Sequence, residues 1–274
     1  GSFYVVNSLV AASIMLVSSA VTYGAWRVLR KPPGKLPKRE EKEEHKIPFQ
    51  EPESITLGRF NKIFLTPDFD KNLIINNLSD IEIKYVDYNL LKDIASTVSP
   101  QGIIAVVDKP DYDFSRINDK KCVLVLDRIQ DPGNMGTLIR TATAAGIGGI
   151  IALKGCVDIY NLKVLKATMG AVFNIPIITR MELNKFLDSY KSSSFNLIST
   201  DIQSQKSYNE IDYKEPLFIV IGNEGDGVRQ QILDKSDYII NIPIIGKIDS
   251  LNAGVSGGII LYDYVSKNIL FSEK

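Results

Sequence analysis

The chain has 274 residues, 45% of them hydrophobic and 23% charged, which is the composition of a globular protein with one large domain or two modest ones. Its 32 basic and 32 acidic residues cancel, so a uniformly basic nucleic-acid-binding surface is excluded, although a local basic patch is not. Two cysteines and a single histidine, His45, exclude a disulfide framework and a four-ligand zinc site, and leave no histidine base elsewhere in the chain. No bound metal is expected.

The first predicted element is an uncharged helix near the start of the chain. Residues 3–26 carry no charge, and as a helix they would span about 36 Å at roughly 1.5 Å per residue, against a bilayer core of about 30 Å. Basic residues follow at once: Arg27, Arg30, Lys31, Lys35, Lys38 and Arg39. We therefore expect residues 1–30 to form a transmembrane helix, an anchor that contacts the membrane through residues 3–26. A signal peptide and a buried core helix are the alternatives.

The predicted anchor carries an expectation about location. By the positive-inside rule the rest of the chain lies on the cytosolic or matrix side, and we expect the mitochondrial inner membrane, with a membrane protein complex as a further partner. Residues 31–54 combine proline with alternating charge and show no apolar periodicity. They are predicted to be a charged, solvated linker between the anchor and the folded part.

A small α/β domain is predicted over residues 55–112. Its expected elements are, in chain order, a strand at residues 62–66, an apolar stretch at 73–78, a strand at 81–86, a helix at 90–97 and a strand at 102–107. The polar segment 108–121 contains Pro110 and marks the end of this domain.

The remaining residues, 118–274, predict a larger parallel α/β domain. The expected strands lie at residues 122–126, 149–153, 196–200, 217–221 and 238–242. The expected helices lie at residues 135–145, 161–171, 181–191, 228–235 and 251–268. The strands are continuous apolar runs, as in parallel strands that are buried on both faces. Ligands of such sheets bind in the loops that follow the carboxyl ends of the strands.

Two of these loops carry polar residues beside glycines. After the first strand, glycines bracket Asn134 where a helix begins, which leaves free backbone N–H groups at the helix N-terminus. Arg140 follows six residues later, close to two helical turns on, and is predicted to point back toward the same loop; an asparagine cap and a solvated arginine are the alternative. After the fourth strand, residues 222–229 place glycines around Glu224, without the ending of a Walker loop or a dinucleotide fingerprint.

The last loop, residues 242–252, leads into the final helix. Ser250 is predicted to be the N-cap of that helix. Its first turns carry only small residues on one face: Ala253, Gly254, Ser256, Gly257 and Gly258. Glycine is unfavourable inside a helix, so this face predicts very close packing against another part of the chain.

These segments, in this order and spacing, resemble the SpoU/TrmH branch of the SPOUT RNA methyltransferases. The matching motifs are Asn-x-Gly-x-x-x-Arg at 134–140, Gly-x-Glu-Gly at 222–225, and Ile-Pro at 242–243 followed by Ser-Leu-Asn at 250–252. Residues 158–170 and Pro176 are similar to the same family. Residues 99–105 resemble the end of an L30e-like substrate-binding domain; its usual first helix and strand are missing here, so we expect it to be truncated.

The resemblance implies a knotted methyltransferase. Residues 118–274 would form the family's deep trefoil knot, one of the exceptions to the rule that chains do not knot. S-adenosylmethionine would bind within the knot, at Thr200 and at the backbone of Gly222, Ile242 and Leu251. The family works as a homodimer with the active site near the subunit interface, and it methylates the ribose 2′-hydroxyl of tRNA or rRNA.

The same resemblance implies a catalytic set of five residues. Arg140 would contact the hydroxyl and stabilise its developing negative charge, because an arginine stays protonated and is a poor literal base. The residues expected to orient Arg140 and the ribose are Asn134, Glu224, Ser250 and Asn252. The alternative is a catalytically silent SpoU-like subunit with a structural or assembly role in an organellar membrane complex. A flavodoxin-like or dehydrogenase protein would need a phosphate fingerprint that the chain lacks.

Overall fold

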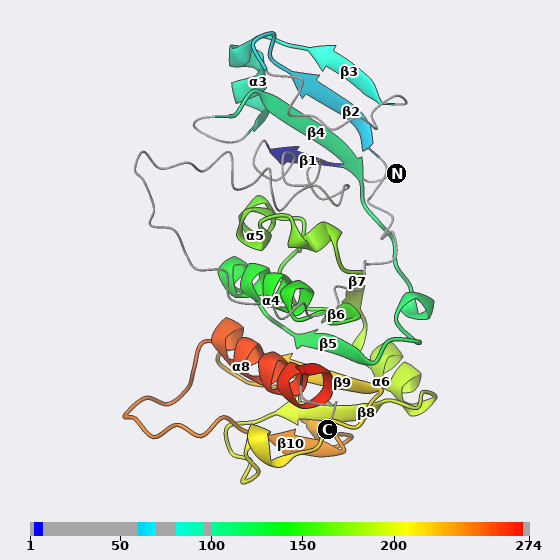
Figure 1. Cartoon of the computed structure of the whole chain (residues 1–274), viewed down its shortest axis with the longest axis vertical. Helices are drawn as coiled ribbons and strands as arrows, with labels where there is room; N and C mark the ends of the chain where they lie inside the picture. Colours follow the sequence, from blue (N-terminus) through cyan, green and yellow to red (C-terminus); the bar gives the residue numbers. More distant parts are fainter. Residues whose placement is uncertain (1–2, 8–59, 70–80, 96–99, 271–274) are drawn as a thin grey trace, which may run out of the picture.

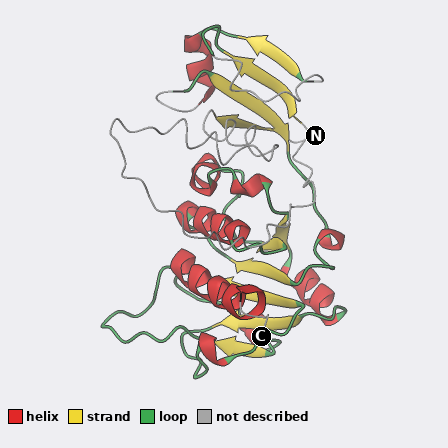
Figure 2. Cartoon of the chain, viewed as in Figure 1, coloured by secondary structure: helices red, strands yellow, loops and turns green. Residues whose placement is uncertain are grey.

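The computed structural model describes residues 3–7, 60–69, 81–95 and 100–270, which form two β-sheets with helices packed against them (Figure 1). The smaller sheet has four strands and the larger has six. In the larger unit, strands alternate with helices along the chain (Figure 2). This alternation confirms the predicted α/β class.

The smaller sheet has the strand order β1-β4-β2-β3. Its elements are β1 (Phe3–Asn7), β2 (Phe60–Leu65), β3 (Glu82–Tyr85), α3 (Tyr88–Ala95) and β4 (Ile103–Asp108). Strands β2 and β3 are parallel, whereas β4 is antiparallel to both β1 and β2. Helix α3 buries Leu91 and Ala95 against Ile104 on one face of the sheet. The opposite face, with Ile63 and Ala105, joins the main hydrophobic core.

The start of the chain differs from its prediction. Phe3–Asn7 is a strand, β1, that pairs antiparallel with β4, so the prediction of a helix beginning at residue 3 is wrong there. Aromatic and β-branched residues favour strands, and β1 supplies hydrogen-bond partners that β4 would otherwise lack along this edge. The rest of the predicted anchor and the predicted linker at 31–54 lie outside the described residues. Among the helices that the structure describes, none has both the length and the apolar character needed to cross a bilayer.

The larger sheet is entirely parallel and has the strand order β10-β8-β9-β5-β6-β7. Its strands are β5 (Cys122–Asp127), β6 (Gly149–Leu153), β7 (Ile177–Met181), β8 (Asn196–Thr200), β9 (Leu217–Gly222) and β10 (Tyr238–Ile240). The five predicted strands are confirmed. Strand β7 has no predicted counterpart, because it lies at the edge of the sheet and exposes Thr179 and Arg180, so its sequence lacks a continuous apolar run.

Every predicted helix of the larger unit is present, with ends that differ by a few residues. The helices are α4 (Pro132–Ala144), α5 (Leu162–Thr168), α6 (Leu183–Lys191), α7 (Gln230–Leu233) and α8 (Ala253–Val265), which continues into a π-helical turn at Ser266–Leu270. Short 3₁₀ turns lie at Phe114–Arg116, Ala171–Phe173 and Tyr208–Glu210. Helix α6 begins at Leu183 because Met181 is the last residue of β7.

The larger sheet is the middle of three layers, because alternate side chains of each strand point to opposite faces. Leu124 and Leu126 of β5 belong to a buried cluster with side chains of α4, α5 and α8. Val123 and Val125 belong to the opposite cluster, with side chains of α6 and α7. All residues of β5 are buried, which accounts for its unbroken apolar sequence up to Asp127.

Helix α8 lies directly against α4, as its small residues predict (Figure 1). A Cβ atom on Gly257 would come within 2.2 Å of the Leu138 side chain of α4, and one on Gly254 within 3.1 Å of Thr137. Real side-chain contacts are longer than the first of these distances, so a side chain at residue 257 would force Leu138 to move within the core. The close contact brings the start of α8 beside the start of α4.

Candidate active site

Three loops of the larger unit meet beside the start of α4. Asn134 is 8% exposed, and its side-chain Nδ2 donates a hydrogen bond to Oε1 of Glu224 at 2.6 Å. Asn252 Nδ2 donates to Asn134 Oδ1 at 2.8 Å. Asp131 caps α4 and holds the backbone N–H of Asn134 with its Oδ1 at 2.7 Å. The three predicted side chains of Asn134, Glu224 and Asn252 therefore form one hydrogen-bonded triad.

The start of α8 corrects the predicted cap. Asn252, and not Ser250, is the N-cap: its Oδ1 accepts hydrogen bonds from the backbone N–H groups of Gly254 at 3.0 Å and Val255 at 3.3 Å. Asparagine caps a helix as well as serine does, and its amide nitrogen stays free to reach Asn134. Ser250 lies exposed in the preceding loop, and its hydroxyl takes part in no hydrogen bond with the described residues.

The residues predicted to bind the cofactor follow three neighbouring strands. Thr200 ends β8, Gly222 ends β9, and Ile242 and Leu251 lie in the loop after β10. Thr200 donates its hydroxyl to the carbonyl oxygen of Val220 at 3.1 Å, which ties the end of β8 to β9. Across residues 242–251, no backbone group is hydrogen-bonded to the described part of the chain. These backbone donors and acceptors are free to bind a ligand.

Position 222 must be glycine because the backbone of the same loop packs directly against it. A Cβ atom there would lie 2.2 Å from the carbonyl carbon of Gly227 and 2.3 Å from the nitrogen of Val228. The loop returns this closely because Asn223 and Gly227 exchange two backbone hydrogen bonds, at 3.0 and 3.1 Å. Any side chain at position 222 would therefore force the loop open.

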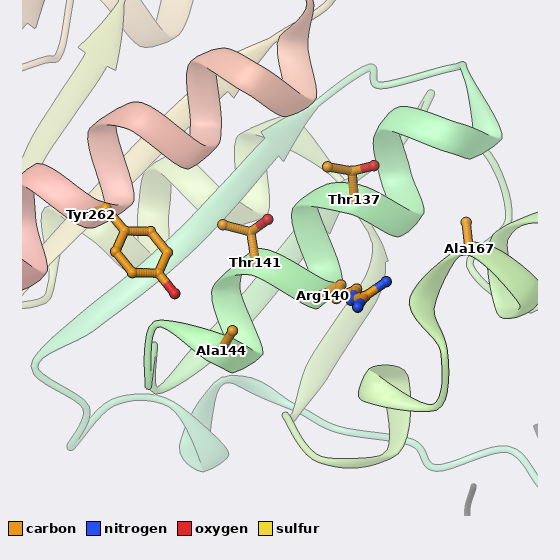
Figure 3. Close-up of a pocket in the computed structure, with 6 residues that line it drawn as sticks. All are labelled: Thr137, Arg140, Thr141, Ala144, Ala167 and Tyr262. Atoms are coloured by element: carbon orange, nitrogen blue, oxygen red, sulfur yellow. The ribbon is translucent and has the colours of Figure 1, made fainter. Parts of the chain in front are cut away.

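Arg140 lies apart from the triad. It is on the exposed face of α4, where it lines an open hollow of about 340 Å³ with Thr137, Thr141, Ala144, Ala167 and Tyr262 (Figure 3). Within the described residues it takes part in no hydrogen bond or ion pair. Its predicted orientation toward the loop of Asn134 is therefore wrong, because the side chain points toward α5. A step of six residues turns an α-helix through about 600°, which leaves the two side chains about 120° apart around the axis.

The sequence prediction missed a buried ion pair at the loop of residues 222–229, called the glycine loop below. Asp127, the last residue of β5, is 0% exposed, and its carboxylate accepts from Arg229 through the backbone N–H at 2.8 Å and through Nε at 2.7 Å. Asp127 lies directly beside Gly222 in the pairing of β5 with β9. The available signal was a charged residue at the end of a continuous apolar strand, since a buried charge needs a partner.

One cysteine, Cys156, lies near this pair with its thiol largely buried. The Cys156 thiol donates to the carbonyl oxygen of Leu126 at 3.3 Å. Burial raises the pKa of Cys156 to about 11, so the thiol stays protonated at neutral pH. The candidate groups for chemistry at this site are therefore amide, carboxylate, hydroxyl and guanidinium groups.

Comparison with known proteins gives this arrangement a family. Residues 121–262 match the SpoU rRNA Methylase family, and residues 56–113 match the RNA 2′-O ribose methyltransferase substrate binding domain. A 23S rRNA guanosine 2′-O-methyltransferase of Bacillus subtilis is 35% identical over 188 residues, which cover 67% of this chain and 74% of the relative. A TrmH family tRNA/rRNA methyltransferase of Staphylococcus saprophyticus is 30% identical over 236 residues, covering 81% and 94%.

Solved structures agree with the fold. The SpoU methyltransferase AviRb of Streptomyces viridochromogenes superposes with a TM-score of 0.69 at 25% identity, covering 78% of this chain and 84% of that one. An AdoMet-bound rRNA methyltransferase of Sinorhizobium meliloti has the same fold, with a TM-score of 0.73 at 22% identity, covering 96% and 87%. The matched segment 121–262 includes Asn134, Glu224 and Asn252. The chain belongs to the SpoU rRNA methylase family.

Proposed function

We propose that this RNA methyltransferase transfers the methyl group of S-adenosylmethionine to a ribose 2′-hydroxyl in rRNA or tRNA. The observation that carries the proposal is the hydrogen-bonded triad of Asn134, Glu224 and Asn252, which joins three loops at one end of the parallel sheet. Ligands of parallel α/β sheets bind at this end. The 2′-O-methyltransferase named for the Bacillus subtilis relative supports the ribose hydroxyl as acceptor.

The residues present fit S-adenosylmethionine as the methyl donor. The unpaired backbone groups of residues 242–251 can bind its polar atoms, and Thr200 and Gly222 lie at the ends of the two strands beside them. When bound, the cofactor supplies a sulfonium-activated methyl group that needs no further activation. The protein then has to orient the acceptor hydroxyl and stabilise its developing negative charge.

Arg140 is the residue that we propose for charge stabilisation at the hydroxyl. Its guanidinium has no partner among the described residues and faces an open hollow, so it is free to bind an RNA phosphate or the 2′-oxygen. Asn134, Glu224 and Asn252 would hold the surrounding loops in place, and the exposed Ser250 hydroxyl would contact the ribose.

We further propose that the chain acts as a homodimer through the exposed face of α4 and α8. Small residues line this face, Tyr262 of α8 is 50% exposed, and Val255 is 51% exposed. A second copy packed there would place Arg140 at the interface, beside a site to which both subunits contribute. We also propose that residues 118–274 form the trefoil knot that the family resemblance implies. Its support is the path of the chain, which leaves β10 at the sheet edge and returns to pack α8 against α4.

Two measurements on the full chain in mild detergent test the proposed function. We expect calorimetric titration to show S-adenosylmethionine binding. We also expect labelled methyl groups to enter rRNA or tRNA at positions that then resist alkaline cleavage, because a methylated 2′-oxygen cannot attack the adjacent phosphate. Cofactor binding without methyl transfer to any cellular RNA would favour the catalytically silent subunit instead. That alternative is not favoured by the triad, whose residues are all present and bonded.

The membrane location is a separate proposal that depends on the sequence alone. Residues 8–26 are uncharged, and we propose that they contact the membrane from one side only. A single crossing of the bilayer would separate Phe3–Asn7 from β4, with which it pairs. We expect the full chain to remain with mitochondrial inner membranes during carbonate extraction, and residues 47–274 to stay in the supernatant. Release of the full chain by carbonate would contradict the anchor and leave the methyltransferase proposal intact.

A further inference from the structure

The end of β5 holds both ends of the glycine loop. Asp127 fixes the C-terminal end of the loop by accepting two hydrogen bonds from Arg229, which is the N-cap of α7. The Arg229 Nη2 atom also lies 2.6 Å from Asp127 Oδ1. The carboxylate is fully buried and the Arg229 side chain is 22% exposed. Asp127 therefore holds Arg229 through both carboxylate oxygens, one on the backbone N–H and one on Nε. A charge pair that is largely shielded from water restricts geometry more strongly than a surface pair does.

Arg128, the next residue after Asp127, also binds the glycine loop, through hydrogen bonds with Asn223 and Gly227. Its backbone is in the left-handed region, with φ of 60°, which is uncommon for a residue with a side chain. In this conformation its carbonyl oxygen accepts from Asn223 Nδ2 at 2.9 Å, and its Nη2 donates to the Gly227 carbonyl at 3.2 Å. The loop is thus attached to the end of β5 at its entry and at its exit.

The loop held in this way carries the site. Glu224 is exposed, lies between the two attachment points, and accepts the hydrogen bond from Asn134. Gly222 adjoins Asp127 across the strand pair. A shift of the loop relative to β5 would therefore move Glu224 away from Asn134. It would also move the backbone of Gly222 relative to residues 242–251, whose backbone groups are unpaired within the described residues.

We propose that Asp127 and Arg229 are positioning residues that set the geometry of the glycine loop for cofactor binding, in concert with Arg128. This inference rests on the proposed function, because it concerns the affinity of the same site for S-adenosylmethionine. Neither residue touches the triad, so each acts through the loop. Their charges matter as a pair: a neutral Asp127 leaves a half-buried guanidinium without its counter-ion.

The test compares S-adenosylmethionine affinities of full-length variants by calorimetry. Asp127→Asn keeps the shape of the side chain and removes its charge. We expect S-adenosylmethionine binding to weaken about ten-fold or more, because breaking the buried charge pair would displace the glycine loop. Asp127→Asn/Arg229→Gln replaces the pair with two neutral amides that can bond to each other. We expect this double variant to bind at least about three-fold more tightly than Asp127→Asn, as coupled neighbours do.

Glu215→Gln is the matched control. Glu215 is also a carboxylate with polar partners, accepting from the Tyr264 hydroxyl at 2.7 Å and lying 3.3 Å from Lys121 Nζ, but it precedes β9 at the opposite end of the sheet. We expect this variant to lose thermal stability and keep its cofactor affinity within about two-fold, since distant sites are independent. A purely structural role for Asp127 would give the same result as this control.

The outcomes separate the two proposals. If Asp127→Asn binds within two-fold of the wild type, or the double variant binds no better than Asp127→Asn, the positioning role is wrong while the proposed function stands. If the wild-type chain does not bind S-adenosylmethionine, the proposed function itself fails. If Asp127→Asn does not fold, Arg229→Lys, which keeps the charge and loses the hydrogen bond from Nε to Asp127, is measured against the same criterion.

Discussion

Arg140→Ala is expected to reduce methyl transfer about 10²-fold or more, because it removes the charge that we propose to stabilise the developing negative charge of the hydroxyl. The affinity for S-adenosylmethionine should stay within a few-fold of the wild type. The reason is the position of Arg140: it faces a hollow between α4, α5 and α8, and is not bonded to the loops that follow β8, β9 and β10. Single-turnover transfer of labelled methyl groups and calorimetric titration measure the two quantities separately.

Lys191→Ala is the control for this prediction. Lys191 is an exposed cation at the end of α6, on the opposite face of the larger sheet, so its loss changes the net charge by the same amount at a distant place. Equal losses of activity in the two variants would show a general electrostatic effect on RNA binding. Full activity of Arg140→Ala would show that another group handles the 2′-hydroxyl.

Gly222→Ala is expected to abolish cofactor binding and to lower the free energy of unfolding. The added Cβ would overlap the backbone of Gly227 and Val228, which cannot move away as a flexible side chain could. Overpacking of this kind costs about 1–3 kcal/mol, and here the strain falls on the loop that carries Glu224. Thermal unfolding and calorimetric titration test the two effects.

Gly225→Ala is the matched variant in the same loop. A Cβ at Gly225 would meet only the Asn223 side-chain oxygen, at 3.4 Å, so the loop has room for it. We expect stability and cofactor affinity close to those of the wild type. Loss of binding in Gly225→Ala with little effect in Gly222→Ala would contradict the prediction. It would show that a side chain in the loop blocks binding by occupying the cofactor's space, and not by disrupting contacts within the loop.

The larger sheet was largely predictable from sequence because its strands are buried on both faces. Burial on both faces requires apolar side chains at every position, so β5 and β9 appear as unbroken apolar runs. Edge positions relax that requirement, which is why β7 escaped prediction. Phe3–Asn7 shows the opposite error: its residues fit either an apolar helix or a strand, and its pairing with β4 is a contact about a hundred residues away.

The residues of the triad were predictable, but the bonds between them were not. Parallel strands bring their carboxyl ends to one side of a sheet, so loops after different strands are expected to meet. Which atoms bond depends on strand order and helix packing: Asn134 and Glu224 are 90 residues apart, and Asn134 and Asn252 are 118 apart. The packing of α8 against α4 also decides that Asn252, and not the predicted Ser250, is the N-cap of α8.

The sequence by itself determined the α/β class, the family and the loops in which the site lies, because strand burial, turns and helix starts depend on residues close together in the chain. Only the tertiary structure decided what each residue contacts. It placed Gly227 and Val228 where a side chain of residue 222 would lie, Arg229 on the buried Asp127, and Arg140 on an open helix face. These are packing contacts between segments that the order of strands brings together, and local sequence preferences do not specify that order.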